Sequence, residues 1–295
     1  MQFEVNSDYG YYELVPKPSP SDLEDYYAEK YYQDEHATYA REYDDEELAY
    51  FKNKIAQKHQ VIQSSLEGKD KKMRLLDIGC GEGFTMDFYY SLGWEVLGLD
   101  FSDFGLAQNH PHLKESLRKG DIFAEIAGLV GAGAVYDVVW LDNVLEHVID
   151  PVELLSQCHQ LTSSGGILMV EVPNDFSQLQ DFLLSTGRVE KPYWQAVPDH
   201  LSYFSFPSLR KLAEATGWST LRMLADFPIE WFLANEHSNY SRNKRVGKGA
   251  HRARVSIENF LASNDSIDME SLLTFYEAMG AIGQGRQIIA FFQKK

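Results

Sequence analysis

The residues best suited to bind a ligand form one short segment, residues 75–84, in which an apolar run carries a single acid and leads into three glycines at alternate positions. About two turns of amphipathic sequence come next, and a second apolar run, residues 94–100, again ends in an acid. This order predicts a strand, a tight glycine turn, a helix N-terminus and a second strand. Such a unit presents bare backbone N–H groups to a ligand, and Asp100 can accept two hydrogen bonds from a ribose.

The glycine spacing separates this segment from the dinucleotide fingerprint G-x-G-x-x-G, whose third glycine would fall on Phe84. Asp77 stands two residues before the first glycine, where a carboxylate would repel a pyrophosphate but attract an ammonium or sulfonium group. An ordinary turn that requires glycines at positive φ is the alternative. The segment resembles motif I of the class I S-adenosylmethionine-dependent methyltransferases. The resemblance implies S-adenosylmethionine as cofactor, its ribose held by Asp100 and its methionine part by Asp77, Gly79, Gly81 and Gly83.

Further matches to the same family follow in order between residues 75 and 227. Residues 135–144 correspond to its fourth strand, residues 145–151 to its LEHV-x-DP segment, and residues 165–174 to a glycine-led fifth strand. Residues 287–292 form a last apolar run. By this resemblance the adenine meets Asp121 and Ile122, and the cofactor site also includes Phe101, Asp142 and Asn143.

Strands that alternate with helices predict a parallel sheet covered by helices on both faces. The resemblance makes the expected fold α/β, with a Rossmann-like, doubly wound and mostly parallel seven-stranded sheet. Ligands bind at the carboxyl ends of the strands of such a sheet, where the acids and glycines above lie. We expect an acidic, Tyr-rich helical lid (1–66), a cofactor-binding core (67–226), an insertion that serves substrate or oligomer contacts (227–283) and the last core strand (284–295).

The expected lid contains two helices. Four tyrosines at helical spacing follow a turn near residues 19–22, and a second helix is predicted over residues 46–66. Two interpretations of the tyrosines are compatible with this pattern: they pack on the core, or their phenols line the substrate pocket. The tyrosines are Tyr26, Tyr27, Tyr31 and Tyr32.

Two histidines are candidates for a base that removes a proton from a hydroxyl acceptor. His147 follows the fourth strand beside Glu146, and His200 follows the fifth-strand region. Each has a structural alternative, since His147 could cap the helix that starts near Asp150 and His200 could bond to a loop. Asn143 stands where a similar branch from the ubiquinone pathway carries Glu, and its amide is a poorer ligand for a divalent ion. We therefore expect no metal.

Composition restricts the partners of the chain, which has 295 residues, 44% hydrophobic residues and a formal charge of -17. That charge argues against a protein that binds nucleic acid or an anionic membrane. The sequence contains no apolar run of about 18 residues, so we expect no membrane span. The first residues lack the basic and apolar regions of a signal peptide. Two cysteines without metal-ligand spacing fit a reducing cytoplasm.

Six basic residues without an acid lie between positions 237 and 257. They suggest a site for an anionic acceptor, such as a sugar that bears a phosphate or carboxylate. The alternatives are a solvated loop, or a contact with the acidic N-terminal segment of this chain or of a second subunit. The six residues are Arg242, Lys244, Arg245, Lys248, Arg252 and Arg254.

Short segments at residues 10–12, 16–18, 238–240 and 283–289 resemble a methyltransferase subgroup associated with bacterial surface carbohydrate biosynthesis. We therefore expect methyl transfer to an oxygen of a sugar or of a related polar small molecule. A phenol or amine acceptor is the nearest alternative. A protein that binds the cofactor without catalysis is the third. The sequence leaves open the identity of the acceptor and the existence of a homodimer.

Overall fold

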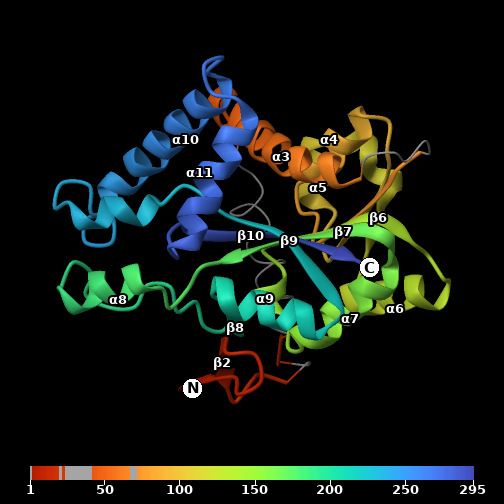
Figure 1. Cartoon of the computed structure of the whole chain (residues 1–295), viewed down its shortest axis with the longest axis horizontal. Coiled ribbons are helices and arrows are strands. Elements are labelled where there is room, and N and C mark those ends of the chain that lie inside the picture. Colours follow the sequence, from red (N-terminus) through yellow and green to blue (C-terminus); the bar gives the residue numbers. More distant parts are fainter. Residues whose placement is uncertain (1, 20–21, 24–41, 67–71) are drawn as a thin grey trace.

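The computed structural model describes residues 2–19, 22–23, 42–66 and 72–295, and a seven-stranded sheet forms its centre (Figure 1). Every pair of neighbouring strands is parallel except where β10 is antiparallel to β7 and β9. The strand order reverses between β3 and β6, which creates a crevice at their carboxyl ends. The expected Rossmann-like sheet is confirmed. In spatial order its strands are β5 (Leu117–Lys119), β4 (Glu95–Asp100), β3 (Arg74–Ile78), β6 (Tyr136–Asp142), β7 (Thr162–Pro173), β10 (Gln287–Lys294) and β9 (Trp218–Ala225).

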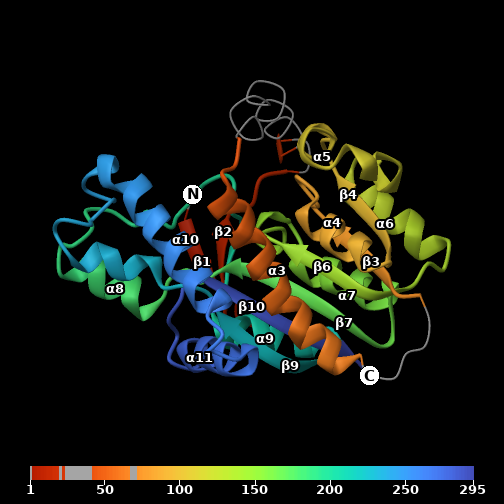
Figure 2. The ribbon, with the colours of Figure 1, turned by 90° about the horizontal axis from the view of Figure 1, so that it is seen from above.

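Helices cover both faces of the sheet, as predicted (Figures 1 and 2). One face packs against α3 (Asp45–Ser65), α4 (Phe84–Ser91) and α11 (Met269–Ala281). Successive residues of a strand point to opposite faces, so Val138 of β6 belongs to this core and Val139 to the other. The opposite face packs against α6 (Ile122–Gly131), α7 (Pro151–Leu161) and α9 (Phe206–Ala215).

The expected insertion lies between β9 and β10. It contains the 3₁₀ turns η3 (Ile229–Ala234) and η4 (Lys244–Val246), then α10 (Gly247–Ser263) and α11. Helix α10 runs beside α3, so the insertion contacts the N-terminal part of the chain (Figure 2). The remaining elements are α5 (Phe104–Asn109), η1 (Pro111–Ser116), η2 (Leu145–His147) and α8 (Gln178–Ser185).

The N-terminal segment is only partly helical, which corrects the expectation of a helical unit over residues 1–66. Strands β1 (Gln2–Val5) and β2 (Tyr12–Val15) form a hairpin, and β2 pairs with β8 (Ser202–Tyr203). The hairpin buries Leu14 in a small apolar cluster with Leu23 and Leu201. Helix α3 matches its prediction within one residue, because Asp44 and Glu47 form a capping box at its start. The tyrosines at positions 26, 27, 31 and 32 lie outside the described residues.

Candidate active site

The glycine loop between β3 and α4 adopts backbone conformations that side chains rarely allow. Gly79, Gly81 and Gly83 have φ of +73, +52 and +81 degrees. A Cβ on Gly79 would lie 2.5 Å from Val144 Cγ2, so only glycine fits there. A Cβ on Gly81 would meet no heavy atom of the described residues within 4 Å. The loop is therefore packed at its base and open at its centre, where a ligand can approach the backbone.

Asp100 ends β4 beside this loop. Its Oδ2 accepts the N–H of Gly81 at 2.8 Å, and its Oδ1 accepts the N–H of Ser102 at 2.9 Å. Burial raises the pKa of Asp100, while these backbone hydrogen bonds oppose the shift. Each carboxylate oxygen keeps a lone pair for a further hydrogen bond. The open loop and this oriented acid fit the ribose and methionine parts of S-adenosylmethionine.

A buried lysine from α3 lies among the acids at the same edge of the sheet. Lys58 Nζ donates to Asp142 Oδ2 at 2.9 Å and also contacts the Glu171 carboxylate. Burial alone would lower the pKa of Lys58, but these two carboxylates raise it. The pKa of Asp77 is raised well above its usual value, first by burial and then by Asp142 and Asp100. A cation of a ligand placed beside Asp77 would oppose this shift and favour the ionised carboxylate.

The other residues assigned to the cofactor lie around this edge. Phe101, directly after Asp100, is 39% exposed. Asp121 is the N-cap of α6, where its Oδ1 accepts the N–H of Ala124 at 2.7 Å, and Ile122 is buried. Gly120 donates its N–H to the carbonyl of Asp100 at 3.0 Å, which holds this segment against the end of β4. The contact of Asp121 and Ile122 with adenine stays a prediction.

Two residues other than glycine have positive φ in the described parts of the chain, and both follow strands at this edge. Asn143 (φ 53) comes directly after β6, and Phe176 (φ 55) comes three residues after β7. Asn143 donates to Asp142 Oδ1 at 2.7 Å and accepts from Gln287 Nε2 at 3.1 Å. Such conformations cluster at functional sites, because the surrounding contacts must hold them in place.

The two candidate histidines are brought together across 53 positions of the chain. Their rings meet edge to face with centroids 4.8 Å apart. His147 Nδ1 lies 2.8 Å from the carbonyl oxygen of Asp199 and so carries the proton, because a carbonyl only accepts. His200 Nδ1 lies 3.9 Å from Asp175 Oδ2. The side chain of Asp150, and not that of His147, caps α7, so His147 has no capping role. A catalytic role of either histidine stays a prediction.

A buried carboxyl group completes this cluster. Glu146 is 1% exposed, and its Oε1 lies 3.8 Å from His147 Nε2. The pKa of Glu146 is raised well above its usual value, mainly by burial. Glu146, His147 and His200 each offer a ligand atom within 4.8 Å of the others, so a metal ion has three candidate ligands here. The expectation of no metal stays a prediction.

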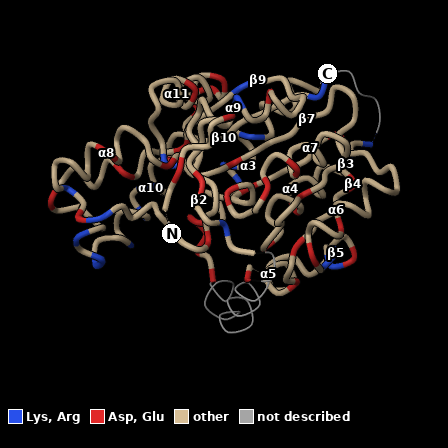
Figure 3. The backbone as a smooth tube through the Cα atoms, turned by 90° about the horizontal axis from the view of Figure 1, so that it is seen from below, with Lys and Arg blue, Asp and Glu red and all other residues tan. Residues whose placement is uncertain are grey.

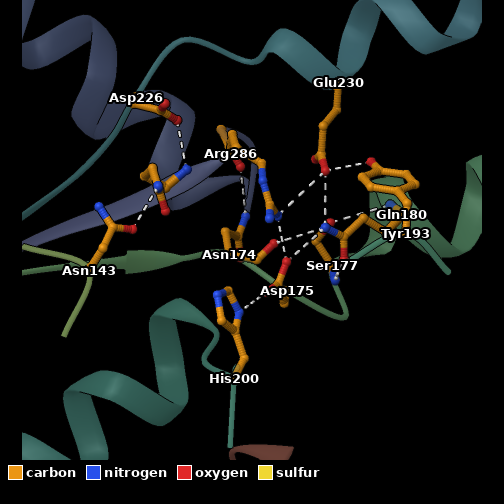
Figure 4. A network of polar contacts seen from close by, with 12 residues as sticks. Asn143, Asn174, Asp175, Ser177, Gln180, Tyr193, His200, Asp226, Glu230 and Arg286 are labelled. Atoms are coloured by element: carbon orange, nitrogen blue, oxygen red, sulfur yellow. Dashed lines mark hydrogen bonds and ion pairs between the residues drawn. The ribbon is translucent and has the colours of Figure 1, made fainter. Parts of the chain in front are cut away.

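Three residues of this region escaped the sequence analysis. Lys58 lies mid-helix, where nothing in the pattern of α3 sets it apart. Asp175 follows β7 and Arg286 precedes β10, and the two side chains contact each other (Figure 4). Arg286 lies within residues 283–289. The resemblance of that segment to the subgroup associated with surface carbohydrate biosynthesis assigns no role to its side chain.

Two of the six basic residues in the insertion contact the N-terminal segment of the same chain. Arg252 Nη2 lies 3.1 Å from Asp44 Oδ2, and the guanidinium of Arg254 lies over the ring of Tyr50 at 5.3 Å. Arg242 donates to the carbonyl of Gly187. Lys and Arg gather at the outer end of the insertion in Figure 3. The contact with the acidic segment is thus present within one chain. Lys248 lines a pocket with Glu42, Asp44 and Glu47 of that segment, so the exposed Lys244 and Arg245 remain for an anionic acceptor.

Comparisons with known proteins agree with this geometry. Residues 40–222 match a family model described as "Methyltransferase domain". A probable S-adenosylmethionine-dependent methyltransferase of Mycolicibacterium smegmatis is 27% identical over 173 residues, which cover 58% of this chain and 61% of that protein. A ubiquinone biosynthesis O-methyltransferase of Colwellia psychrerythraea is 32% identical over 148 residues, covering 48% of this chain and 58% of that protein. The matched regions thus span little more than half of these relatives.

A solved structure supports the fold. The crystal structure of a SAM-dependent methyltransferase from Archaeoglobus fulgidus has a TM-score of 0.51 and 16% identity, and the match covers 90% of this chain and all of that one. In the described part of the chain, every helix is too short or too polar to cross a membrane.

Proposed function

The chain belongs to the methyltransferase-domain family, and on that premise we propose that it transfers the methyl group of S-adenosylmethionine to an oxygen of a sugar or a related polar small molecule. The observation that carries this proposal is the position of the histidine pair at the sheet edge that also bears the glycine loop and Asp100. A base and a cofactor cradle at one edge are what hydroxyl methylation requires.

The protein has little covalent chemistry to perform in this reaction. S-adenosylmethionine, when bound, supplies a methyl group that is already activated by the sulfonium. Asp100 and the N–H groups of the glycine loop would orient that cofactor, and Asp77 would favour its positive charge. His200 would accept the proton of the acceptor hydroxyl at a ring nitrogen, with His147 as the alternative base.

The surroundings of His200 favour a polar acceptor. Asp175, Gln180, Glu230 and Arg286 form a buried and half-buried polar network next to the imidazole (Figure 4). Hydroxyl groups of a sugar can exchange hydrogen bonds with carboxylates and amides of this kind. The exposed Lys244 and Arg245 support the narrower proposal that the acceptor is anionic.

A phenolic acceptor is the second candidate. Its support is the resemblance to ubiquinone biosynthesis O-methyltransferases, of which the one from Colwellia psychrerythraea is 32% identical over 148 residues. Aromatic residues near His200 could also pack on a phenol: Tyr203 lies 5.9 Å from the imidazole, and Phe176 lies 5.5 Å from Tyr203, between ring centroids.

A screen of acceptors separates these proposals. Purified full-length protein would receive methyl-labelled S-adenosylmethionine with nucleotide sugars, catechols or primary amines. Label in a sugar supports the leading proposal, and label confined to catechols or amines supports the alternatives. Cofactor binding by calorimetry without label in any set indicates a binding protein without catalysis. Because both cysteines are buried free thiols, the reducing cytoplasm is the proposed setting.

A further inference from the structure

Asp175 is a buried carboxylate with its two oxygens in different surroundings (Figure 4). Its Oδ1 accepts hydrogen bonds from Arg286 Nη1 and, at 3.2 Å, from Gln180 Nε2. Its Oδ2 faces His200 Nδ1 at 3.9 Å. One oxygen is thus held by two donors from other elements, while the second is directed at the histidine.

The backbone on both sides of this contact is also held. Asp175 donates its N–H to the carbonyl of Phe204 at 3.2 Å, and His200 donates its N–H to the carbonyl of Ala196 at 2.7 Å. The next residue, Phe176, stacks on Tyr12 with ring centroids 4.2 Å apart. The backbones of Asp175 and His200 are therefore each held by contacts that do not involve the other residue.

We infer that Asp175 is a positioning residue that selects the tautomer of His200 with the proton on Nδ1. At 3.9 Å the contact is electrostatic and not a hydrogen bond, and the negative charge of the carboxylate favours an N–H over a lone pair on the nitrogen that faces it. The lone pair then lies on Nε2, the nitrogen that would remove the acceptor proton. In that step the acceptor O–H bond breaks, an Nε2–H bond forms, and the carboxylate stabilises the resulting imidazolium. The role of His200 as base rests on the proposed function, whereas the preferred tautomer of His200 does not depend on it.

If the role of Asp175 were purely structural, a different result would be expected. Arg286 also lies 3.7 Å from Glu230 in the insertion, and Glu230 accepts from Gln180 Nε2 at 3.0 Å. If Asp175 only anchored Arg286, its loss and the loss of Glu230 would both lower stability and leave the imidazole unchanged. Glu230→Gln is therefore the matched control, since it alters the same network without touching His200.

The tautomer can be measured without knowing the acceptor. Full-length protein with ¹⁵N-labelled histidine, saturated with S-adenosylhomocysteine as probe, would be studied by long-range ¹H–¹⁵N NMR at about pH 8, where neutral imidazole dominates. The resonances that vanish in His200→Gln identify His200. We expect Nδ1–H as the major tautomer in the wild type and in Glu230→Gln, and a smaller Nδ1–H share in Asp175→Asn.

The inference is overturned if the wild type holds mainly Nε2–H, or if Asp175→Asn has the tautomer ratio of the wild type. If Asp175→Asn does not fold, the wild-type spectrum still decides. With an acceptor identified by the screen, Asp175→Asn should lose about tenfold or more in kcat with little change in KM. An Nδ1–H tautomer without any methyl transfer would support the inference and contradict the proposed function.

Discussion

Lys58 and Asp142 connect the helix that precedes the glycine loop with the carboxyl end of β6, through a bond of 2.9 Å between Nζ and Oδ2. Both residues take part in a buried group of charges, since Lys58 also contacts Glu171. The cofactor edge of the sheet therefore depends on a residue that lies outside every recognisable motif.

Replacement of Lys58 by Met should destabilise the protein by about 3–5 kcal/mol, because it leaves buried carboxylates without their cation. Urea unfolding of the two proteins measures this difference. Lys52→Ala is the matched control, because Lys52 is exposed on the same helix and should change stability by less than about 0.5 kcal/mol. Equal effects of the two substitutions would contradict the role assigned to Lys58.

Asp100→Ala should weaken the binding of S-adenosylmethionine at least about tenfold, because each charged hydrogen bond to the ribose contributes about 1.5–3 kcal/mol. Isothermal calorimetry gives the dissociation constants. Glu95→Gln serves as control, since Glu95 is the first residue of the same strand and lies at the end away from the glycine loop. Unchanged affinity in Asp100→Ala would remove Asp100 from the ribose site.

His200→Gln should lower turnover by about 10²–10⁴ while the affinity for S-adenosylmethionine stays within about twofold. The measurement is initial-rate kinetics on an acceptor found in the screen. The same substitution at His147 tests the alternative base. If both variants keep full activity, the acceptor ionises without help from either histidine.

Asp226 should make stability depend on pH. Burial raises the pKa of Asp226 to about 7, with Lys54 opposing the shift. A carboxyl whose pKa is higher in the folded state contributes stability below its unfolded pKa and loses that contribution as pH rises through about 7. Asp226→Asn keeps an oxygen that can accept the N–H of Gln287, which Asp226 Oδ1 accepts at 2.7 Å.

We therefore expect Asp226→Asn and the wild type to have similar free energies of unfolding near pH 4. Near pH 8 the variant should be more stable by up to about 4 kcal/mol. Urea titrations at both pH values measure the difference. Other carboxyls with raised pKa are common to both proteins and cancel, so an equal difference at the two pH values would contradict this assignment.

Replacement of Lys244 and Arg245 by Ala should raise the KM for an anionic acceptor without changing the affinity for the cofactor. Both residues are exposed, and their attraction for an anion should weaken as salt rises. Kinetics at low and high salt test this. Arg252→Ala is the control, because Arg252 pairs with Asp44 within the chain. If the double variant keeps its KM but changes its oligomeric state on a sizing column, these residues form an interface.

Local sequence determined the elements around the cofactor. The glycines at 79, 81 and 83 and the acids that end two strands were recognisable because they satisfy requirements of their own turns, namely positive φ and free backbone donors. The capping box of Asp44 and Glu47 likewise set the start of α3 within one residue. The strand hairpin at the N-terminus was missed, since β1 and β2 are short and become stable by pairing with β8, far along the chain.

Only the tertiary structure decided which polar side chains meet. His147 and His200 lie together because the chain returns to the same edge of the sheet after α8. Asp175 and Arg286 meet across 111 positions, and Lys58 of α3 meets Asp142 at the end of β6 across 84 positions. No local pattern encodes such contacts: a buried charge requires a partner, but the sequence does not say which residue the fold will bring to it.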